Sequence, residues 1–126
     1  MSDSRYELID FGGGRKLESL GGYIIDRPSP AALSHRKRRP ALWKETDAAF
    51  DPQQRHWEFR TPWPDELLVE CDGFLMPLRP TPYGHIGLVP EQAANWNWLA
   101  SKPVAEQRPL DALNLFAYTG ASTMAL

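Results

Sequence analysis

The residues best suited to chemistry lie near the end of the sequence. Gly120 follows an apolar run over residues 112–118 and precedes the small residues of the segment 121–125. Such a run has the length of a buried parallel strand. A glycine after it lets the backbone approach a ligand, while the N–H groups of a following helix face the polar part of that ligand. This order is typical of the first β-α unit of a Rossmann-like nucleotide-binding fold.

Spacing alone leaves a second interpretation open. The sequence lacks the G-x-G-x-x-G of dinucleotide sites, and it lacks the G-K-[ST] of a P-loop. A strand followed by Thr119-Gly120 also occurs in α/β proteins that bind no cofactor. A purely structural β-α element therefore remains an alternative at this point.

Two segments resemble those of a known enzyme family. Residues 114–122, NLFAYTGAS, closely resemble the N-L-F-x-Y-T-G-x motif of class I methyltransferases related to the ribosomal RNA cytosine-C5 methyltransferases. Residues 84–92, GHIGLVPEQ, resemble the family's G-x-F-x-D-Q segment. Glu91 stands where aspartate is commoner, and Ala93 stands where arginine is frequent. Longer blocks over residues 11–30, 82–98 and 113–122 look like a subgroup of S-adenosylmethionine-dependent methyltransferases, so the resemblance extends along most of the chain.

The resemblance implies methyl transfer from S-adenosyl-L-methionine, with ribosomal or similar RNA as substrate. It implies that the cofactor is lined by Gln92, Phe116, Tyr118, Thr119, Gly120 and Ala121. Relatives would continue for roughly 150 to 200 residues, the size needed to complete such a domain. We therefore expect an N-terminal part that lacks the acidic residue for the ribose and the catalytic nucleophile, and that is inactive by itself.

The elements that position this motif are predicted to be mostly β-strands. The sequence has 126 residues, of which 42% are hydrophobic and 24% charged, a balance typical of one modest globular domain. Its 12 prolines and nine glycines indicate short elements and many turns. Strands are predicted over residues 6–11, 16–20, 23–26, 42–46, 56–60, 67–71 and 74–79. Asp72-Gly73 is predicted to form the type I′ turn of a hairpin between the last two.

A helix is predicted over residues 90–100, because Pro90 precedes the acidic Glu91 at the start of an apolar periodic segment. The fold class is therefore α+β, with two parts. Residues 1–83 form a β-rich N-terminal region, and residues 84–126 begin a Rossmann-like cofactor-binding domain.

The remaining reactive side chains favour structural roles. Cys71 lies in an apolar β-prone run and is interpreted as a small buried hydrophobe, not as a catalytic nucleophile. His35, His56 and His85 are far apart in the sequence and lack partners at ligand spacing, so no metal is expected.

Charge and targeting signals restrict the partners. The formal net charge is −2, so binding to RNA would have to be local. The basic run over residues 35–39 is a candidate for that contact, although a solvated loop is the simpler interpretation. The sequence shows no signal peptide and no membrane-spanning segment, which favours the cytoplasm. The alternative to an enzyme is a non-enzymatic β-rich module that binds RNA or a protein.

Overall fold

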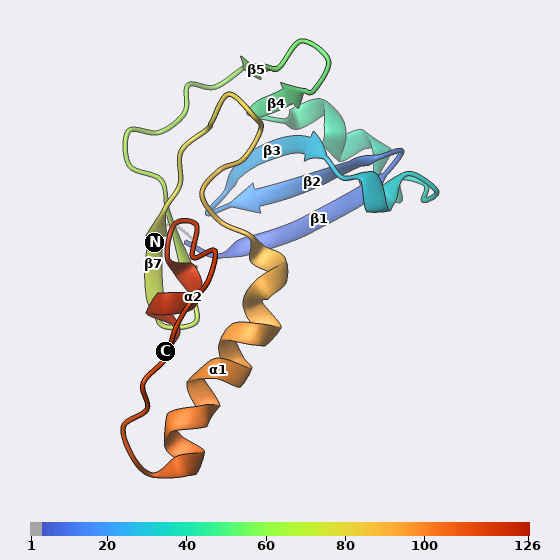
Figure 1. Ribbon diagram of the computed structural model, residues 1–126. Coiled ribbons are helices and arrows are strands. Elements are labelled where there is room, and N and C mark those ends of the chain that lie inside the picture. Colours follow the sequence, from blue (N-terminus) through green and yellow to red (C-terminus); the bar gives the residue numbers. More distant parts are fainter. Residues whose placement is uncertain (1–3) are drawn as a thin grey trace.

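The computed structural model describes residues 4–126, and in that part of the chain the strands form two sheets (Figure 1). The larger sheet has the order β1-β2-β3-β4-β5, in which β3 and β4 are parallel and the other neighbours are antiparallel. The smaller sheet is the hairpin β6-β7. The strands are β1 (Tyr6–Gly12), β2 (Arg15–Leu20), β3 (Tyr23–Pro28), β4 (Ala48–Asp51), β5 (His56–Phe59), β6 (Leu68–Cys71) and β7 (Phe74–Pro77). The helices are η1 (Pro30–Ala32), η2 (Pro40–Glu45), η3 (Pro90–Gln92), α1 (Ala93–Glu106) and α2 (Ala121–Met124), where η marks a 3-10 helix.

The predicted strands at the start of the chain are confirmed as the meander β1-β2-β3. Glycine pairs form both turns, and Gly21 and Gly22 have φ of 58° and 91°, values that glycine adopts without strain. The hairpin β6-β7 is also confirmed, since Asp72 and Gly73 both have the positive φ of a type I′ turn. In each case the two partners are neighbours in sequence, so local turn chemistry defines the pairing.

The strand predicted over residues 42–46 is wrong, because this segment belongs to η2. The carboxylate of Asp10 in β1 holds the segment against the sheet. It accepts hydrogen bonds from the backbone N–H groups of Arg38 (3.2 Å) and Arg39 (2.9 Å) and from the indole Nε1 of Trp43 (2.8 Å). These tertiary contacts override the β-propensity of the segment. The next strand, β4, pairs with β3 and was not among the predicted strands.

The helix predicted from residue 90 is confirmed at its start and extends further than predicted. Pro90 opens η3, which continues directly into α1, and α1 ends at Glu106 rather than near residue 100. Gln107 ends it in the left-handed conformation, with its N–H donated to the carbonyl oxygen of Pro103. Across residues 4–126, no helix combines the length and apolar character needed to span a bilayer.

One hydrophobic core joins both sheets to α1 and α2. Ile25, Val69 and Ile86 are almost fully buried in it, and Trp96 and Ala121 extend it to the two helices. The core thus runs across the predicted domain boundary between residues 83 and 84, which stays a prediction.

The strand predicted over residues 112–118 is not formed, so only the helical part of the predicted β-α unit is present. This segment is irregular, and Leu113, Leu115 and Phe116 expose 84%, 69% and 100% of their surface. A parallel strand requires neighbouring strands to satisfy its backbone groups. Within the described residues no strand pairs with this segment, and the apolar side chains of Leu113, Leu115 and Phe116 are exposed to solvent.

Candidate functional site

Five of the six residues predicted to contact a cofactor line one cavity of about 340 Å³. We call it the motif cavity. It lies between η3, the start of α1 and the segment that leads into α2. Its walls are formed by Val89, Gln92, Trp96, Asn114, Leu115, Phe116, Ala117, Tyr118, Thr119, Ala121 and Ser122. Gly120, the sixth predicted residue, is not part of this wall. Gln92 is more than 20 positions from the rest of the predicted set, so the fold brings the two segments together.

Hydrogen bonds attach the motif segment to the rest of the protein. The Thr119 hydroxyl donates to the carbonyl oxygen of Gly87, and the indole Nε1 of Trp96 donates to Ser122 Oγ at 3.0 Å. Trp96 is buried and its ring also lies edge-on to Phe74 in β7. The end of the motif is therefore fixed to the core, whereas residues 113–116 are mostly exposed.

Three of the five residues from 116 to 120 have a left-handed backbone conformation. Phe116, Tyr118 and Gly120 have φ of 57°, 53° and 91°. Such values cost little for glycine but are unfavourable for aromatic residues, and they occur preferentially at functional sites. A Cβ atom placed on Gly120 would meet no atom within 4 Å. The space in front of this glycine is open, as close approach of a ligand to the backbone requires.

The chemistry available in the motif cavity is hydrogen bonding and apolar contact. Gln92 and Asn114 supply amide groups, Ser122 supplies a hydroxyl, and Phe116 and Tyr118 supply exposed rings. The Gln92 side chain is oriented by the Nδ2 of Asn95, which donates to its Oε1 at 2.7 Å. The wall thus suits a polar, uncharged mode of recognition.

Six lining residues were not among the predicted contacts, and three of them carry a polar side-chain group. Asn114 belongs to the motif itself, and its Nδ2 donates to Thr123 Oγ1 at 2.8 Å, so its polar type inside an apolar run was the available signal. Ser122 also lies in the motif. Trp96 lies one helical turn after Gln92, a spacing at which helical side chains share a face.

Other candidate groups lie outside the motif cavity. Cys71 is buried, and burial, together with nearby Asp72 and Glu70, raises the pKa of its thiol to about 11. The thiol is therefore protonated at neutral pH, and a protonated thiol is a poor nucleophile. Among residues 4–126, no three His, Cys, Asp or Glu side chains gather in a way that would hold a metal ion.

Comparison with solved structures identifies a similar protein. The chain is similar to part of a methyltransferase. It matches the crystal structure of the SAM-dependent methyltransferase from Agrobacterium tumefaciens with a TM-score of 0.86 and 34% sequence identity. The match covers 95% of this chain and 39% of the length of that methyltransferase chain. No protein-family model and no curated protein matches the sequence.

The similarity extends over the β-rich sheet as well as the motif cavity, because it covers nearly the whole chain. The mixed architecture of a five-stranded sheet, a hairpin and few helices is thus shared with part of an S-adenosylmethionine-dependent enzyme.

Proposed function

We propose that these 126 residues are part of a longer S-adenosylmethionine-dependent methyltransferase, and that the motif cavity holds its cofactor. The observation that carries the proposal is the convergence of five predicted residues on one cavity, namely Gln92, Phe116, Tyr118, Thr119 and Ala121. It occurs in a chain that is 34% identical to part of a solved SAM-dependent methyltransferase. The cavity of about 340 Å³ also falls within the range of roughly 300–1,000 Å³ typical of small-molecule sites.

The residues present fit such a cofactor by their chemistry. Amide and hydroxyl groups of Gln92, Asn114 and Ser122 match the polar methionine part, and the rings of Phe116 and Tyr118 offer flat apolar surfaces to an adenine. When bound, the cofactor supplies a methyl group on a sulfonium, which an acceptor attacks in line. The residues of this chain then bind and orient, and positioning of this kind supplies a large part of a rate enhancement.

Four finer statements belong to the same proposal. The substrate is RNA, as the resemblance of residues 114–122 to the ribosomal RNA methyltransferases implies, and the enzyme acts in the cytoplasm. In the complete enzyme, residues 112–118 pair with neighbouring strands as the first strand of a Rossmann-like domain. The 126 residues alone bind the cofactor weakly, because the exposed and irregular segment 113–116 must be ordered at a cost in entropy.

The test is cofactor binding by the full-length protein, measured by calorimetry, with Gly120→Val against wild type. A branched side chain in the open space before Gly120 blocks approach of the ligand and weakens binding at least tenfold, or about 1.4 kcal/mol. Gly22→Val is the matched control. Gly22 has the same φ of 91° and, like Gly120, no atom within 4 Å of the position that a Cβ would take, but it lies in the β2-β3 turn.

The two variants separate a cofactor contact from backbone strain. Both lose similar stability, since both place a side chain at the same unfavourable φ. Selective loss of binding in Gly120→Val supports the proposal. Equal binding in both variants would reduce Gly120 to a turn residue. Absence of binding in the wild type would contradict the methyltransferase and favour a non-enzymatic module that binds RNA or a protein.

A further inference from the structure

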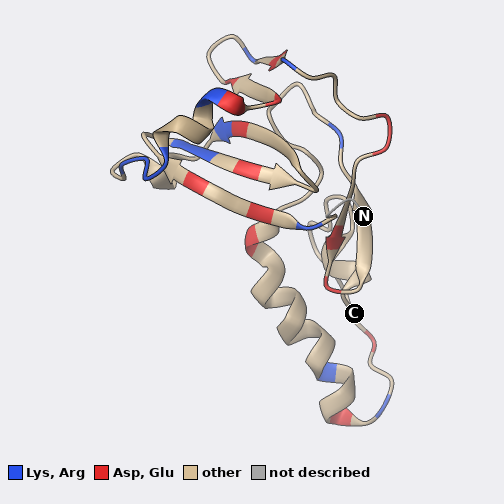
Figure 2. Cartoon of the chain, turned by 180° about the vertical axis from the view of Figure 1, so that it is seen from behind, with Lys and Arg blue, Asp and Glu red and all other residues tan. Residues whose placement is uncertain are grey.

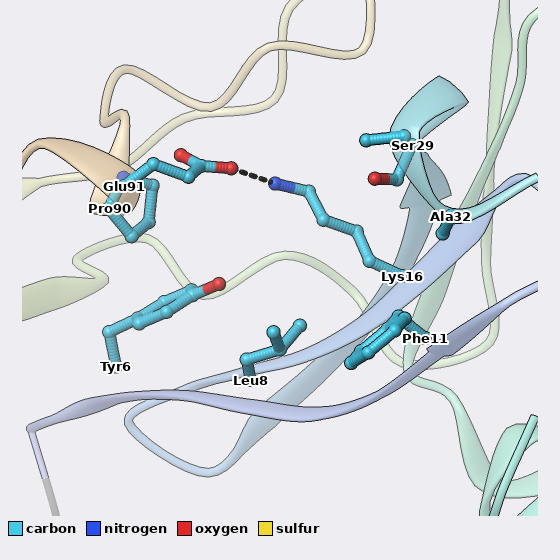
Figure 3. A pocket seen from close by; sticks show the side chains of 9 residues that line it. Tyr6, Leu8, Phe11, Lys16, Ser29, Ala32, Pro90 and Glu91 are labelled. Carbon is cyan, nitrogen blue, oxygen red and sulfur yellow. Dashed lines mark hydrogen bonds and ion pairs between the residues drawn. The ribbon is translucent and has the colours of Figure 1, made fainter. Parts of the chain in front are cut away.

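A second cavity, of about 400 Å³, lies on the β1-β2 face of the large sheet (Figure 3). We call it the sheet cavity. It is lined by Tyr6, Leu8, Phe11, Lys16, Ser29, Ala31, Ala32, Pro90 and Glu91. Its floor is apolar and open, since Leu8 and Phe11 expose 46% and 36% of their surface. Figure 3 shows Leu8 and Phe11 below the long side chain of Lys16, with Tyr6 and Glu91 at the far end.

A β-bulge in β1 creates this floor. Leu8 pairs with Glu18, and the next paired residue, Asp10, faces Leu17, so Ile9 is the extra residue. In a regular strand, residues three apart point to opposite faces. The bulge reverses the alternation and places Leu8 and Phe11 on the same face, as their partners Glu18 and Lys16 show. Bulges of this kind commonly re-aim side chains beside functional sites.

The polar end of the sheet cavity presents a donor and an acceptor side by side. Lys16 Nζ lies 2.9 Å from Glu91 Oε1 and 3.2 Å from Glu18 Oε1. Glu18 is in turn held by Arg27, through contacts of 2.7 and 2.8 Å. The Lys16 side chain is only 14% exposed, whereas that of Glu91 is 62% exposed. A fixed ammonium beside an accessible carboxylate above an aromatic ring matches the edge and face of a nucleobase.

Glu91 is ionised at neutral pH. Burial opposes its charge, but the hydrogen bond from Lys16 and the nearby charges of Lys16 and Arg27 outweigh burial, so its pKa lies below the usual value. The carboxylate thus acts only as an acceptor, for example of an exocyclic amino group.

A run of cations lies next to the same floor. The ring of His35 packs edge-on against Phe11 with 5.3 Å between centroids, and the carbonyl oxygen of His35 accepts the N–H of Gly13 at 2.9 Å. The exposed cations of residues 36–39 follow directly. Figure 2 shows this loop as a continuous basic stretch at the end of the sheet. From His35 the loop passes round the β1-β2 turn, because Asp10, on the opposite face of β1 from Phe11, binds the backbone N–H groups of Arg38 and Arg39.

The sheet cavity and the motif cavity lie on either side of one short segment. Pro90 and Glu91 line the sheet cavity, whereas Val89 and Gln92 line the motif cavity. A molecule that fills the sheet cavity from Phe11 to Glu91 would therefore end at the segment that also borders the motif cavity.

We propose that the sheet cavity and the basic loop 36–39 bind single-stranded RNA, with one unpaired base on Phe11 and Leu8, its edge on Lys16 and Glu91, and the flanking phosphates on the loop. The nature of this partner rests on the proposed function, and the proposal adds where the substrate is held. Aromatic stacking combined with a basic track is how proteins hold single-stranded nucleic acid, and it fits a chain whose net charge is negative but whose cations are local.

The test is fluorescence anisotropy of a labelled single-stranded RNA of mixed sequence with the full-length protein. Phe11→Ala weakens binding by roughly tenfold, because stacking of one base is lost. Phe11→Trp retains an aromatic surface and restores binding, which a merely structural role of the ring would not explain. Phe59→Ala is the matched control, since Phe59 is a similarly exposed aromatic residue of β5, outside the sheet cavity. Arg36→Gln with Arg38→Gln lowers the dependence of binding on salt by about two phosphate contacts.

Cofactor binding, measured on the same samples, separates this proposal from the proposed function. Loss of RNA binding in Phe11→Ala with unchanged cofactor binding supports the RNA site. Equal RNA binding by wild type and Phe11→Ala overturns the site, even if the cofactor binds. No RNA binding by the wild type also overturns it, and leaves a protein as the partner of this face. Failure of cofactor binding alone contradicts the methyltransferase but not the RNA site.

Discussion

The meander β1-β2-β3 and the motif segment 112–118 are both predicted from the sequence as β-structure, yet they differ in the folded chain. In the meander, Leu17, Leu20 and Ile25 are fully buried. In the motif segment, Leu113 and Phe116 are almost entirely exposed, and the backbone follows an irregular path.

The difference shows which kind of strand can form from local sequence. Each meander strand finds its antiparallel partner after a two-residue turn, at a small cost in loop entropy. A parallel strand depends on partners that are far away in sequence. Apolar character is therefore a requirement for a buried strand but does not create one.

Buried charge makes the meander sensitive to a single substitution. Glu18 is fully buried, accepts hydrogen bonds from Arg27 and from the hydroxyl of Tyr6, and forms an ion pair with Lys16. We expect Glu18→Ala to lower the free energy of unfolding by about 3–5 kcal/mol, because it leaves the charge of Arg27 buried without its partner. Urea denaturation followed by tryptophan fluorescence measures this change.

A control in the neighbouring strand makes the result specific. Glu7 lies in β1 and is exposed, so Glu7→Ala should change stability by no more than about 0.5 kcal/mol. Because Trp96 and Ala121 share the core with the meander, Glu18→Ala should also disrupt the motif cavity. A loss equal to that of Glu7→Ala would show that the buried network adds nothing to the sheet.

A smaller loss of stability is expected from substitution of Asp10, whose carboxylate holds the non-strand segment 38–43 on the sheet. Burial alone would raise its pKa, but hydrogen bonds from the Trp43 indole and from the backbone of Arg39 and Arg38 lower it to about 2. A pKa below the ordinary value of 3.8 stabilises the fold above about pH 4, and this contribution is lost as the pH falls towards 2. We expect Asp10→Asn to cost about 2 kcal/mol at pH 7, the scale of hydrogen bonds to a charged group.

The pH dependence of that loss is the decisive measurement. The difference in unfolding free energy between wild type and Asp10→Asn should be constant from pH 7 to about pH 5 and shrink between about pH 4 and pH 2. Trp43→Phe removes the indole donor to Asp10 and should therefore cause a smaller, similarly pH-dependent loss of stability. A difference that persists unchanged at pH 2 would mean that the charge of Asp10 does not hold the segment.

These cases define how much of the fold is readable from the sequence. The meander, the β6-β7 hairpin and the start of α1 depend on glycine turns and on Pro90, which are local signals. Strand β4 and helix η2 depend on contacts with β3 and Asp10, which lie more than 20 positions away. The extension of α1 past residue 100 was missed because Pro103 and polar residues suggest an end, although Lys102, Ala105 and Glu106 favour a helix.

The candidate sites show the same contrast between local sequence signals and contacts that are distant in sequence. Gln92 and the motif residues were grouped by resemblance, and the fold places five of the six predicted residues around one cavity. The sheet cavity could not be predicted, because the bulge at Ile9 has no glycine or other sequence signal to announce it. Its position is visible only once the register of β1 against β2 is known.

The smallest loss of stability is expected in the motif segment 112–118, which the comparison sets against the meander. In the 126-residue chain, Leu113→Ser should change the unfolding free energy by no more than about 0.5 kcal/mol, because Leu113 is 84% exposed. Leu20→Ser, at a fully buried leucine, should cost at least about 3 kcal/mol in the same assay. A loss of several kcal/mol at Leu113 would mean that residues 112–118 are already buried as a strand. In a longer protein that supplies neighbouring strands, the same substitution should become as costly as Leu20→Ser, since the pairing that buries an apolar strand would then exist.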